Sequence, residues 1–147
     1  MGMNLDTGVL IRIERTGDPR PLQEFGRERP LLISSITAAE LLIGVHRADS
    51  PQREQRRRAQ VEGFLSSIPV LPFTLSTARI HAKAKVDLST RGLTIGAHDL
   101  IIAATALEHG HDVVTTNRRE FERVPGLKVI DFPPIPPPQP SPPSAND

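Results

Sequence analysis

The sequence predicts an α/β domain of three layers, in which a central, mostly parallel sheet of about five strands lies between helices. Short apolar segments typical of buried strands alternate along the chain with longer segments whose apolar residues recur at helical spacing. Strands that are joined in this order by helices form parallel sheets covered on both faces. The chain has 147 residues, which is the size of one domain.

The predicted strands are short and apolar, and each is bounded by turn-forming residues. The first apolar segment runs through residues 9–11 into a helix, and a turn-rich stretch around Pro30 precedes the second strand. The five predicted strands are residues 3–6, 31–34, 70–71, 112–115 and 127–130.

The predicted helices separate these strands. Residues 37–48 carry apolar side chains at helical spacing, and Pro51 starts a polar, arginine-rich helix that runs to about residue 67. Residues 76–90 form the next helix. Residues 97–109 are the clearest helix in the chain, because Gly110 directly after them is a typical helix stop.

The composition divides the chain into a body, residues 1–132, and a proline-rich tail, residues 133–147. The tail holds eight of the 15 prolines, so we expect it to be extended and solvated rather than packed. The chain has no cysteine, which excludes disulfides and thiolate metal sites and fits a cytoplasmic protein. We find no signal peptide and no apolar stretch of the ~20 residues that a membrane helix requires.

The charge is balanced overall but uneven along the chain. The net charge is +1, so no global basic field indicates a nucleic-acid partner. Arg53 and residues 56–58 nevertheless crowd one short stretch, opposed by Glu54. This stretch is either a solvated helix face or a surface for RNA phosphates or an acidic partner. Tryptophan and tyrosine are absent, so no aromatic platform for stacking unpaired bases is visible.

Three acids and one amide are predicted to converge on one edge of the sheet. Asp6 ends the first strand, and Glu40 lies in the first turns of the helix after the second strand. Asp99 lies in the first turn of the helix that leads to the fourth strand, and Asn117 follows that strand. Binding crevices of open α/β sheets lie outside the carboxyl ends of the strands, which is where these residues are expected.

Three carboxylates in one crevice require a counter-charge. Each like-charged pair at ~4 Å costs about 4 kcal/mol at an effective dielectric constant near 20. A divalent cation removes this cost, and an all-oxygen ligand set suits Mg²⁺ or Mn²⁺ better than zinc. Such a cation activates water and binds a phosphate oxygen during phosphodiester hydrolysis. The hydroxyl of Thr7, next to Asp6, is a candidate contact to that water or to a phosphate.

Each of these residues also has a purely structural interpretation. Glu40 fits a capping box with Thr37, and Asp99 fits a favourable charge at a helix N-terminus. Asp6 fits a turn at the end of a strand, and Asn117 fits a loop residue with a left-handed backbone. The predicted convergence of all four on one edge favours a functional site over four separate structural roles.

The tripeptide Asp6-Thr7-Gly8 is also the motif that carries the catalytic carboxylate of aspartic proteases. That site requires two such elements, or one element in a β-rich dimer. This chain contains one Asp-Thr-Gly and is rich in predicted helices, which argues against a protease. A phosphoacceptor domain with Asp6 as the phosphorylated residue is another alternative.

Four stretches of the body resemble one family in order and spacing. They are MNLDTGVLI (3–11), ISSITAAELLIGVHRA (33–48), LTIGAHDLIIAATALEHG (93–110) and VVTTNRREFERVPGLKVIDF (113–132). Together these stretches resemble PIN-domain ribonucleases, and specifically the VapC-type toxins of bacterial toxin–antitoxin pairs. The resemblance covers nearly the whole body and ends at Phe132.

The resemblance implies a PIN-like fold and a Mg²⁺- or Mn²⁺-dependent endoribonuclease, commonly a homodimer, that a small VapB-type antitoxin inhibits. By position, Asp6, Glu40 and Asp99 match the three core acids of the family. Asn117 matches a fourth position that is often aspartate, so one negative charge is lost and a second metal would bind more weakly. Gly8 stands where the family often has Asn or Ser. The alternative is a catalytically weak module that binds RNA or the antitoxin.

The predicted catalytic set is therefore Asp6, Glu40, Asp99 and Asn117. The first three are predicted metal ligands, with Glu40 as ligand or as a base that orients water. Thr7 and Arg118 are predicted substrate contacts.

If the arginine-rich stretch binds RNA or an acidic partner, neutralising Arg56, Arg57 and Arg58 weakens that binding and flattens its salt dependence, because fewer counterions are released. Binding measured across a salt series tests this. Unchanged affinity and unchanged salt dependence would mean that the stretch is only a solvated helix face.

Overall fold

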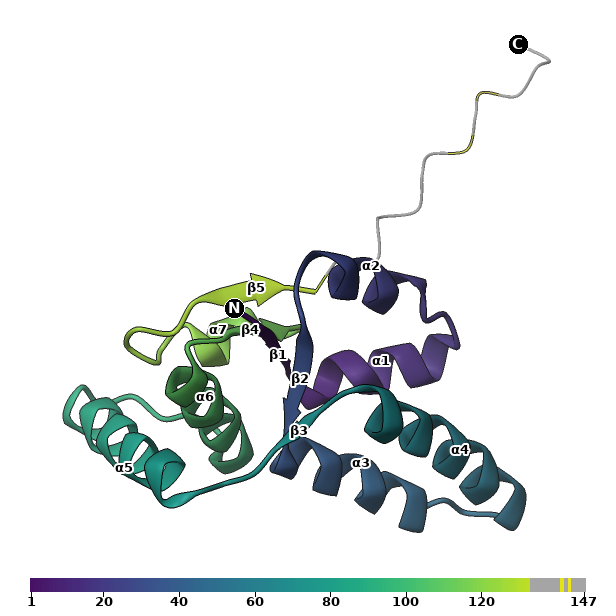
Figure 1. The fold of residues 1–147 in the computed structure, drawn as a ribbon, viewed down its shortest axis with the longest axis horizontal. Helices are drawn as coiled ribbons and strands as arrows, with labels where there is room; N and C mark the ends of the chain where they lie inside the picture. Colours follow the sequence, from purple (N-terminus) through teal and green to yellow (C-terminus); the bar gives the residue numbers. More distant parts are fainter. Residues whose placement is uncertain (133–140, 142, 144–147) are drawn as a thin grey trace.

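The computed structural model describes residues 1–132, 141 and 143, and the predicted tail lies almost entirely outside the described residues (Figure 1). The predicted sheet is confirmed, with its strands in the order β3-β2-β1-β4-β5. Every pairing between neighbouring strands is parallel. The strands are β1 (Met3–Leu5), β2 (Leu31–Ser34), β3 (Val70–Leu71), β4 (Asp112–Thr115) and β5 (Val129–Asp131).

The predicted helices are confirmed with small shifts at their ends, and two further helices are present. The helices are α1 (Thr7–Thr16), α2 (Arg20–Glu28), α3 (Ser35–His46), α4 (Pro51–Ser67), α5 (Leu75–Thr90), α6 (Ala97–His109) and the short α7 (Arg118–Phe121). The sequence predicted a turn-rich stretch around Pro30 and did not predict α2, which precedes that proline. Proline is tolerated in the first helical turn, where Pro21 lies, because its missing N–H has no intrahelical partner there.

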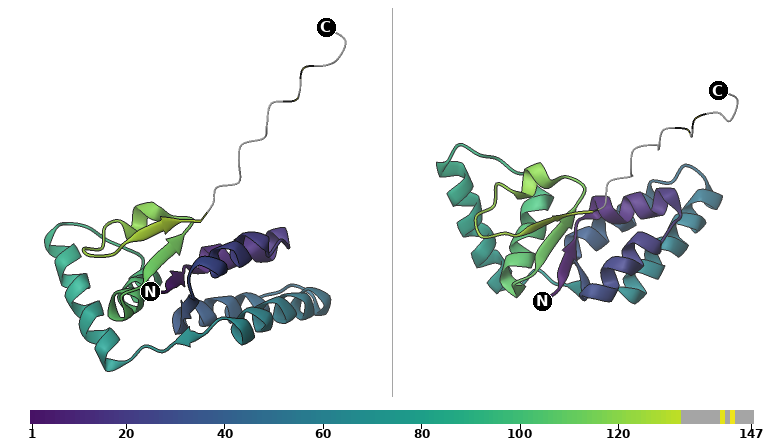
Figure 2. Two further views of the ribbon diagram at one scale, coloured as in Figure 1. Left: turned by 45° about the horizontal axis from the view of Figure 1, so that its top comes forward. Right: turned by 90° about the horizontal axis from the view of Figure 1, so that it is seen from above.

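Helices cover both faces of the sheet, so the predicted three-layer arrangement is confirmed (Figure 2). On one face, α1 to α4 pack over β1 and β2, with Leu5, Leu10 and Ile33 fully buried between them. On the other face, α6 packs over β1, β2 and β4, α7 packs on β5, and α5 packs on α6. Ile102 and Phe121 are fully buried in this layer. The sheet therefore lies between two apolar cores, one on each of its faces.

The order of the strands places the first strand at a topological switch point. From β1 the chain proceeds to β2 and β3 on one side of the sheet, and it returns to place β4 and β5 on the other side. The carboxyl ends of β1 and β4 are therefore neighbours. The chain after β1 leads toward β2 on one side, and the chain after β4 leads toward β5 on the other side. This is the location at which open α/β sheets bind ligands.

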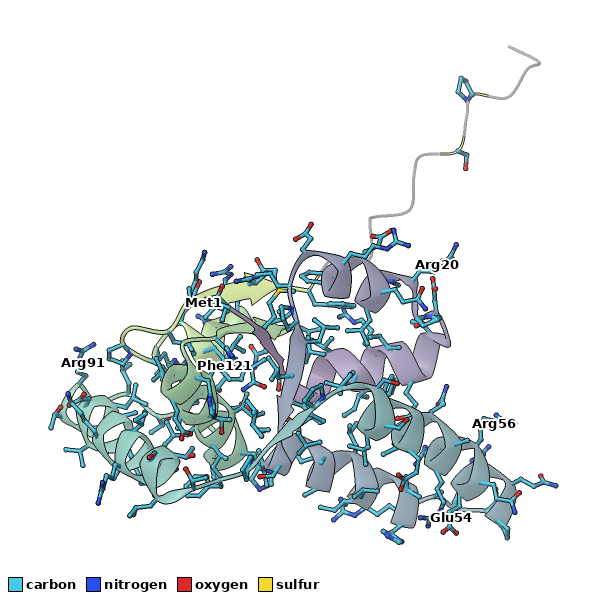
Figure 3. The ribbon with its side chains drawn as sticks, viewed as in Figure 1. Met1, Arg20, Glu54, Arg56, Arg91 and Phe121 are labelled. Atoms are coloured by element: carbon cyan, nitrogen blue, oxygen red, sulfur yellow. The ribbon has the colours of Figure 1, made fainter. Side chains whose placement is uncertain are left out.

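The arginine-rich stretch lies on α4, which packs against α3 (Figure 3). Arg57 donates from Nη1 to the backbone oxygen of Gly44 at 3.0 Å and lies 3.5 Å from Glu14. Arg53 pairs with Asp49, and Arg58 pairs with Glu54. Exposed pairs of this kind add little stability, and they offset part of the positive charge on which the proposed phosphate-binding surface would depend. No helix in the described part of the chain is both long enough and apolar enough to span a membrane.

Asn4 is an unusual residue for the centre of a sheet. It is fully buried in β1, between Leu32 of β2 and Val113 of β4. Its side-chain Oδ1 and Nδ2 have no hydrogen-bond partner among the described residues. An unpaired buried amide costs free energy of folding.

We expect Asn4→Val to raise the free energy of unfolding by about 1–3 kcal/mol, because it removes two unsatisfied polar atoms and suits a strand. Urea unfolding of wild type and variant measures this. Asn4→Asp is the opposite control and should lower stability, because it buries a charge. A less stable Asn4→Val protein would mean that the amide has a partner, such as a buried water.

Candidate active site

Asp6 follows β1 directly and forms the N-cap of α1, so its carboxylate lies at the switch point of the sheet. It is only 7% exposed. The hydroxyl of Thr115, at the end of β4, donates to Asp6 Oδ2 at 2.8 Å. This hydrogen bond joins the carboxyl ends of two neighbouring strands that are more than a hundred residues apart in the sequence.

Burial raises the pKa of Asp6 above its ordinary value, and the negative charge of Glu40 adds to this shift. The Thr115 hydroxyl and the N–H groups of Thr7 and Gly8 at the start of α1 lower the pKa in part. The start of α1 also lies close to the loop after β4. A Cβ atom on Gly8 would come within 3.0 Å of Thr116 Oγ1, so the glycine permits this approach.

Glu40 reaches the same end of the sheet from α3. Its Oε1 accepts a hydrogen bond from the Thr7 hydroxyl at 3.0 Å, and Oε2 lies 3.7 Å from His98 Nδ1. The capping-box interpretation of Glu40 with Thr37 was wrong. Ser34 caps α3 instead, because its hydroxyl accepts from the Thr37 N–H. The Glu40 carboxylate is thereby free of the helix end and turns toward Asp6 and α6.

Asp99 lies in the first turn of α6, as predicted, and its side chain is half-buried. Its pKa is raised from 3.8 to about 6, chiefly because burial removes water from the carboxylate. The charges of Asp6, Glu120 and Glu40 raise it further, while His98 opposes them. Asp99 therefore lies close enough to all three acids to feel their charges.

Glu120 is an acid of this cluster that the sequence prediction did not include. It lies on α7, after β4, and its Oε2 accepts from the N–H of Gly96 at 3.4 Å. Gly96 is the N-cap of α6, and a Cβ there would lie 3.2 Å from Asp99 Oδ2. A usable sequence signal was present, because Glu120 is an acid three residues after Asn117, at the predicted carboxyl end of the fourth strand.

Asn117 lies at the predicted edge, but its exposed side chain makes no hydrogen bond in the described part of the chain. Its backbone N–H donates to Thr115 Oγ1 at 2.8 Å, and that hydroxyl in turn donates to Asp6. The backbone of Asn117 thus fixes the orientation of the Thr115 hydroxyl, while its amide group is available to solvent.

The two predicted substrate contacts have different surroundings. Thr7 is buried at the site, where it donates to Glu40 and lies 3.1 Å from Thr37 Oγ1. The guanidinium of Arg118 instead makes bonds away from the acids. Arg118 Nε donates to Asp131 at 3.0 Å, and Nη2 donates to the Val129 oxygen at 2.9 Å. These bonds engage Arg118 with the edge strand β5.

The chemistry of these donors fits a hard divalent cation, because Asp6, Glu40, Asp99 and Glu120 offer only oxygen atoms. The negative charges of Asp6, Glu120 and Glu40 add to the burial that raises the pKa of Asp99. Within residues 1–132, 141 and 143, however, no three acidic or histidine side chains are gathered so that they could hold a metal ion. Like charges keep the carboxylates apart, so bringing them around one ion requires side-chain rotation.

Comparison with known proteins agrees with this fold. The sequence profile of the PIN domain matches residues 3–127. Ribonuclease VapC1 of Rickettsia felis is 35% identical over 130 residues, covering 88% of this chain and 96% of the relative. The tRNA(fMet)-specific endonuclease VapC of Salmonella typhimurium is 38% identical over 102 residues, covering 69% of this chain and 75% of the relative.

Solved structures show the same likeness. VapBC2 from Rickettsia felis, bound to a promoter DNA fragment, superposes with a TM-score of 0.82 at 26% identity, covering 90% of this chain and all of the other chain. DNA-bound VapBC from Salmonella typhimurium superposes with a TM-score of 0.80 at 33% identity, covering 90% and 99% of the two chains. The chain belongs to the PIN domain family and, within it, to the VapC-type proteins.

The raised pKa of Asp99 predicts a pH-dependent loss of stability in the metal-free protein. The folded pKa, about 6, lies above the ordinary 3.8, so folding favours the protonated acid. The contribution of Asp99 to the free energy of unfolding is therefore most favourable below about pH 4, falls as the pH rises to about 6, and stays reduced above that range. Asp99→Asn removes this penalty.

We expect Asp99→Asn to raise the Tm of metal-free protein at pH 7.5 by about 3–6 °C, a modest value because Asp99 is partly exposed. The gain should shrink as the pH falls toward 4. Thermal unfolding followed by circular dichroism measures both. Asp87→Asn on α5 is the control and should change little at either pH. A gain that is equal at pH 4 and pH 7.5 would contradict the assignment.

Proposed function

We propose that the chain is a metal-dependent endoribonuclease, the toxin of a VapBC-type toxin–antitoxin pair, and that it hydrolyses RNA phosphodiester bonds. The observation that carries the proposal is that three carboxylates, those of Asp6, Glu40 and Glu120, act on the half-buried carboxylate of Asp99 at the switch point of the sheet. Membership of the PIN domain family and relatives named as VapC ribonucleases support RNA as the substrate.

The proposed cation is Mg²⁺ or Mn²⁺, and Asp6, Glu40 and Asp99 are its proposed ligands. When bound, this ion supplies Lewis acidity to a phosphate oxygen and lowers the pKa of water. Glu120 is a further candidate ligand, because its charge acts on Asp99 as those of Asp6 and Glu40 do. Below pH 6, protonation of Asp99 competes with the cation, so affinity for the metal should fall.

The remaining residues position these carboxylates. The Thr115 hydroxyl donates to Asp6, and the Thr7 hydroxyl donates to Glu40, so each acid has one oxygen fixed by a neighbour. The other oxygens are available to a cation or to an attacking water, and Glu40 is the proposed base that orients this water. His98 beside Glu40 is placed to offset part of the negative charge when it is protonated.

Asn117 and Arg118 take smaller parts in this proposal. The Asn117 amide, exposed beside Thr115, is placed to support the water around the ion without adding charge. Arg118 is engaged with Asp131 and Glu122, so direct substrate contact by Arg118 requires these bonds to open. Thr7 is the stronger candidate for a contact to the substrate, because its hydroxyl already lies among the acids.

The proposed partners are a VapB-type antitoxin and a second copy of the chain. The similar solved structures are those of VapBC complexes, which supports an antitoxin partner. Exposed apolar side chains occur in β3, at the start of α5 and in the segment between them, with Val70 40%, Phe73 44% and Leu75 67% exposed. An exposed apolar surface of this kind supports a homodimer contact. The proposed location is the cytoplasm, where RNA substrates occur.

Asn117 also favours one alternative, a module that binds RNA or the antitoxin but cuts weakly. An amide in place of a fourth carboxylate at this position reduces the charge available to a second ion. Tight RNA binding without cleavage in any divalent metal would support that alternative.

The proposed activity predicts that purified chain cleaves RNA with Mg²⁺ or Mn²⁺ and not with EDTA. Asp6→Asn and Asp99→Asn should each lower the rate by about 10²-fold or more, because each removes a charged ligand. Glu120→Gln should lower it by about 10-fold or more. The measurement is the initial rate on a fluorescent RNA.

Glu122→Gln is the matched control for Glu120→Gln. Both residues lie at α7, but Glu122 pairs with Arg118 instead of acting on Asp99. The control should retain near wild-type activity. Equal rates for wild type, Asp6→Asn and Asp99→Asn would overturn the assigned site.

A further inference from the structure

The hydroxyl of Thr7 has two acceptors within reach but only one hydrogen to donate. Thr7 Oγ1 lies 3.0 Å from Glu40 Oε1 and 3.1 Å from Thr37 Oγ1, and it is placed to donate to either atom. A threonine hydroxyl carries a single O–H group, so the two hydrogen bonds compete for one hydrogen. Thr7 therefore donates either to an acid of the proposed cation site or to a neighbouring hydroxyl.

Glu40 is the stronger of the two acceptors in the metal-free chain. The two distances are nearly equal, so distance does not decide between them. A hydrogen bond to an ionised carboxylate is roughly twice as strong as one between neutral groups. The hydrogen of Thr7 is therefore directed at Glu40, and the Thr37 oxygen stands beside it as a second acceptor.

The position of Thr37 is fixed at the start of α3. Thr37 is fully buried, its backbone N–H donates to Ser34 Oγ at 3.3 Å, and its hydroxyl oxygen lies 3.3 Å from that same atom. Branching at Cβ further restricts its side-chain rotation in a helix. A hydroxyl oxygen has two lone pairs, so Thr37 can accept from Thr7 whichever hydroxyl donates in its bond with Ser34.

A cation at the acids requires Glu40 to move. Within the described residues, no three acidic or histidine side chains are close enough together to hold a metal ion. A carboxylate is a rigid planar group, so a movement that carries Glu40 Oε2 toward an ion also carries Oε1 away from Thr7. The Thr7 hydroxyl, in a residue that is only 4% exposed, then loses its charged acceptor.

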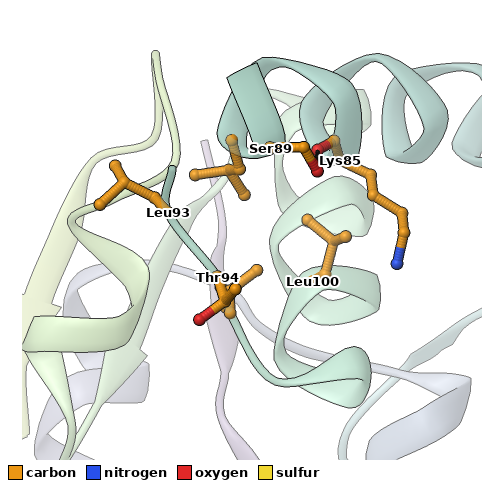
Figure 4. A pocket seen from close by; sticks show the side chains of 7 residues that line it. Lys85, Ser89, Leu93, Thr94 and Leu100 are labelled. Carbon is orange, nitrogen blue, oxygen red and sulfur yellow. Dashed lines mark hydrogen bonds between the residues drawn. The ribbon is translucent and has the colours of Figure 1, made fainter. Parts of the chain in front are cut away.

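A buried hydroxyl without a partner is costly, so Thr7 needs a replacement for Glu40. A small cavity lies between α5, α6 and the loop that joins them, with Thr94 and Leu100 in its lining (Figure 4). Neither Thr7 nor Thr37 lines this cavity, so water held there is not a partner for the Thr7 hydroxyl. The Thr37 oxygen, at 3.1 Å, is already in place.

We propose that Thr37 is a positioning residue of the cation site, which accepts the hydrogen of Thr7 when Glu40 turns toward a divalent cation. Glu40 is thereby released without leaving a buried hydroxyl unpaired. Thr37 touches neither the cation nor the substrate and acts only through Thr7. The inference rests on the proposed function for its cation, but it is measured by Mn²⁺ binding in the absence of RNA.

The test is the Mn²⁺ affinity of the full chain, measured by electron paramagnetic resonance from the signal of free Mn²⁺. Thr37→Val keeps the shape of the side chain and removes its oxygen. It should raise the Kd for Mn²⁺ by about 10-fold, because Thr7 is left without an acceptor only in the bound state. Thr37→Ser returns the hydroxyl and should bring the Kd to within about 2-fold of wild type.

A double-mutant cycle separates this role from a packing defect. In a Thr7→Val background, Thr37→Val should change the Kd by less than about 2-fold, because no Thr7 hydroxyl remains to be left unpaired. Thr7→Val alone should bind Mn²⁺ at least as tightly as Thr37→Val, because Glu40 then has no hydrogen bond to give up. A packing defect at Thr37 would weaken binding equally in both backgrounds.

Thr105→Val on α6 is the matched control. Thr105 is also a buried threonine, 1% exposed, and its hydroxyl donates to the Ile101 backbone oxygen at 2.8 Å rather than to an acid. The substitution removes a buried hydroxyl of the same kind and should leave the Kd for Mn²⁺ unchanged.

Three results would each overturn the role of Thr37: a wild-type Kd in Thr37→Val, equal effects of Thr37→Val in both backgrounds, or no recovery in Thr37→Ser. Loss of Mn²⁺ binding in Thr7→Val would overturn it as well. A wild type that binds no Mn²⁺ refutes both this role and the proposed cation. A chain that binds Mn²⁺ with the expected coupling but cleaves no RNA refutes the ribonuclease and leaves the role of Thr37 in place.

Discussion

Repulsion among carboxylates is the constraint on which the functional end of this molecule depends. Burial raises the pKa of Asp99, and the charges of Asp6, Glu120 and Glu40 raise it further. The ionised form of Asp99 is therefore disfavoured in the folded chain. The apolar cores on the two faces of the sheet supply the stability that tolerates this arrangement. A cation that converts repulsion into attraction is the simplest physical reason for a fold to maintain it.

The parallel sheet makes this crowding possible because it brings distant segments to one edge. The switch point between β1 and β4 places Asp6 beside Thr115, and the hydrogen bond between them fixes the orientation of the carboxylate. Helices α3 and α6 then start at the same edge and present Glu40 and Asp99. The loop before α6 is held from α7, because Glu120 accepts from the N–H of Gly96.

Much of this arrangement follows from the sequence, and the exceptions have physical reasons. Alternating strands and helices imply parallel topology, and parallel topology places Asp6, Glu40 and Asp99 together. Helix α2 escaped prediction because it is polar and buries only Leu22 fully. The contribution of Glu120 depends on where the four-residue α7 lies, which helical spacing cannot reveal at that length. The direction of Arg118 depends on the register of β5, since Asp131 and the Val129 oxygen attract its guanidinium.

The pKa of Asp99 shows whether crowded carboxylates and a cation share this end of the sheet. It can be measured by following the side-chain carboxyl carbons of ¹³C-labelled, metal-free protein by NMR across a pH series. Asp99 should titrate near 6 without metal and at a clearly lower pH when Mg²⁺ is added, because the ion stabilises the ionised form. Titration near its ordinary 3.8 in the metal-free protein, or no response to Mg²⁺, would contradict a cation site built on these acids.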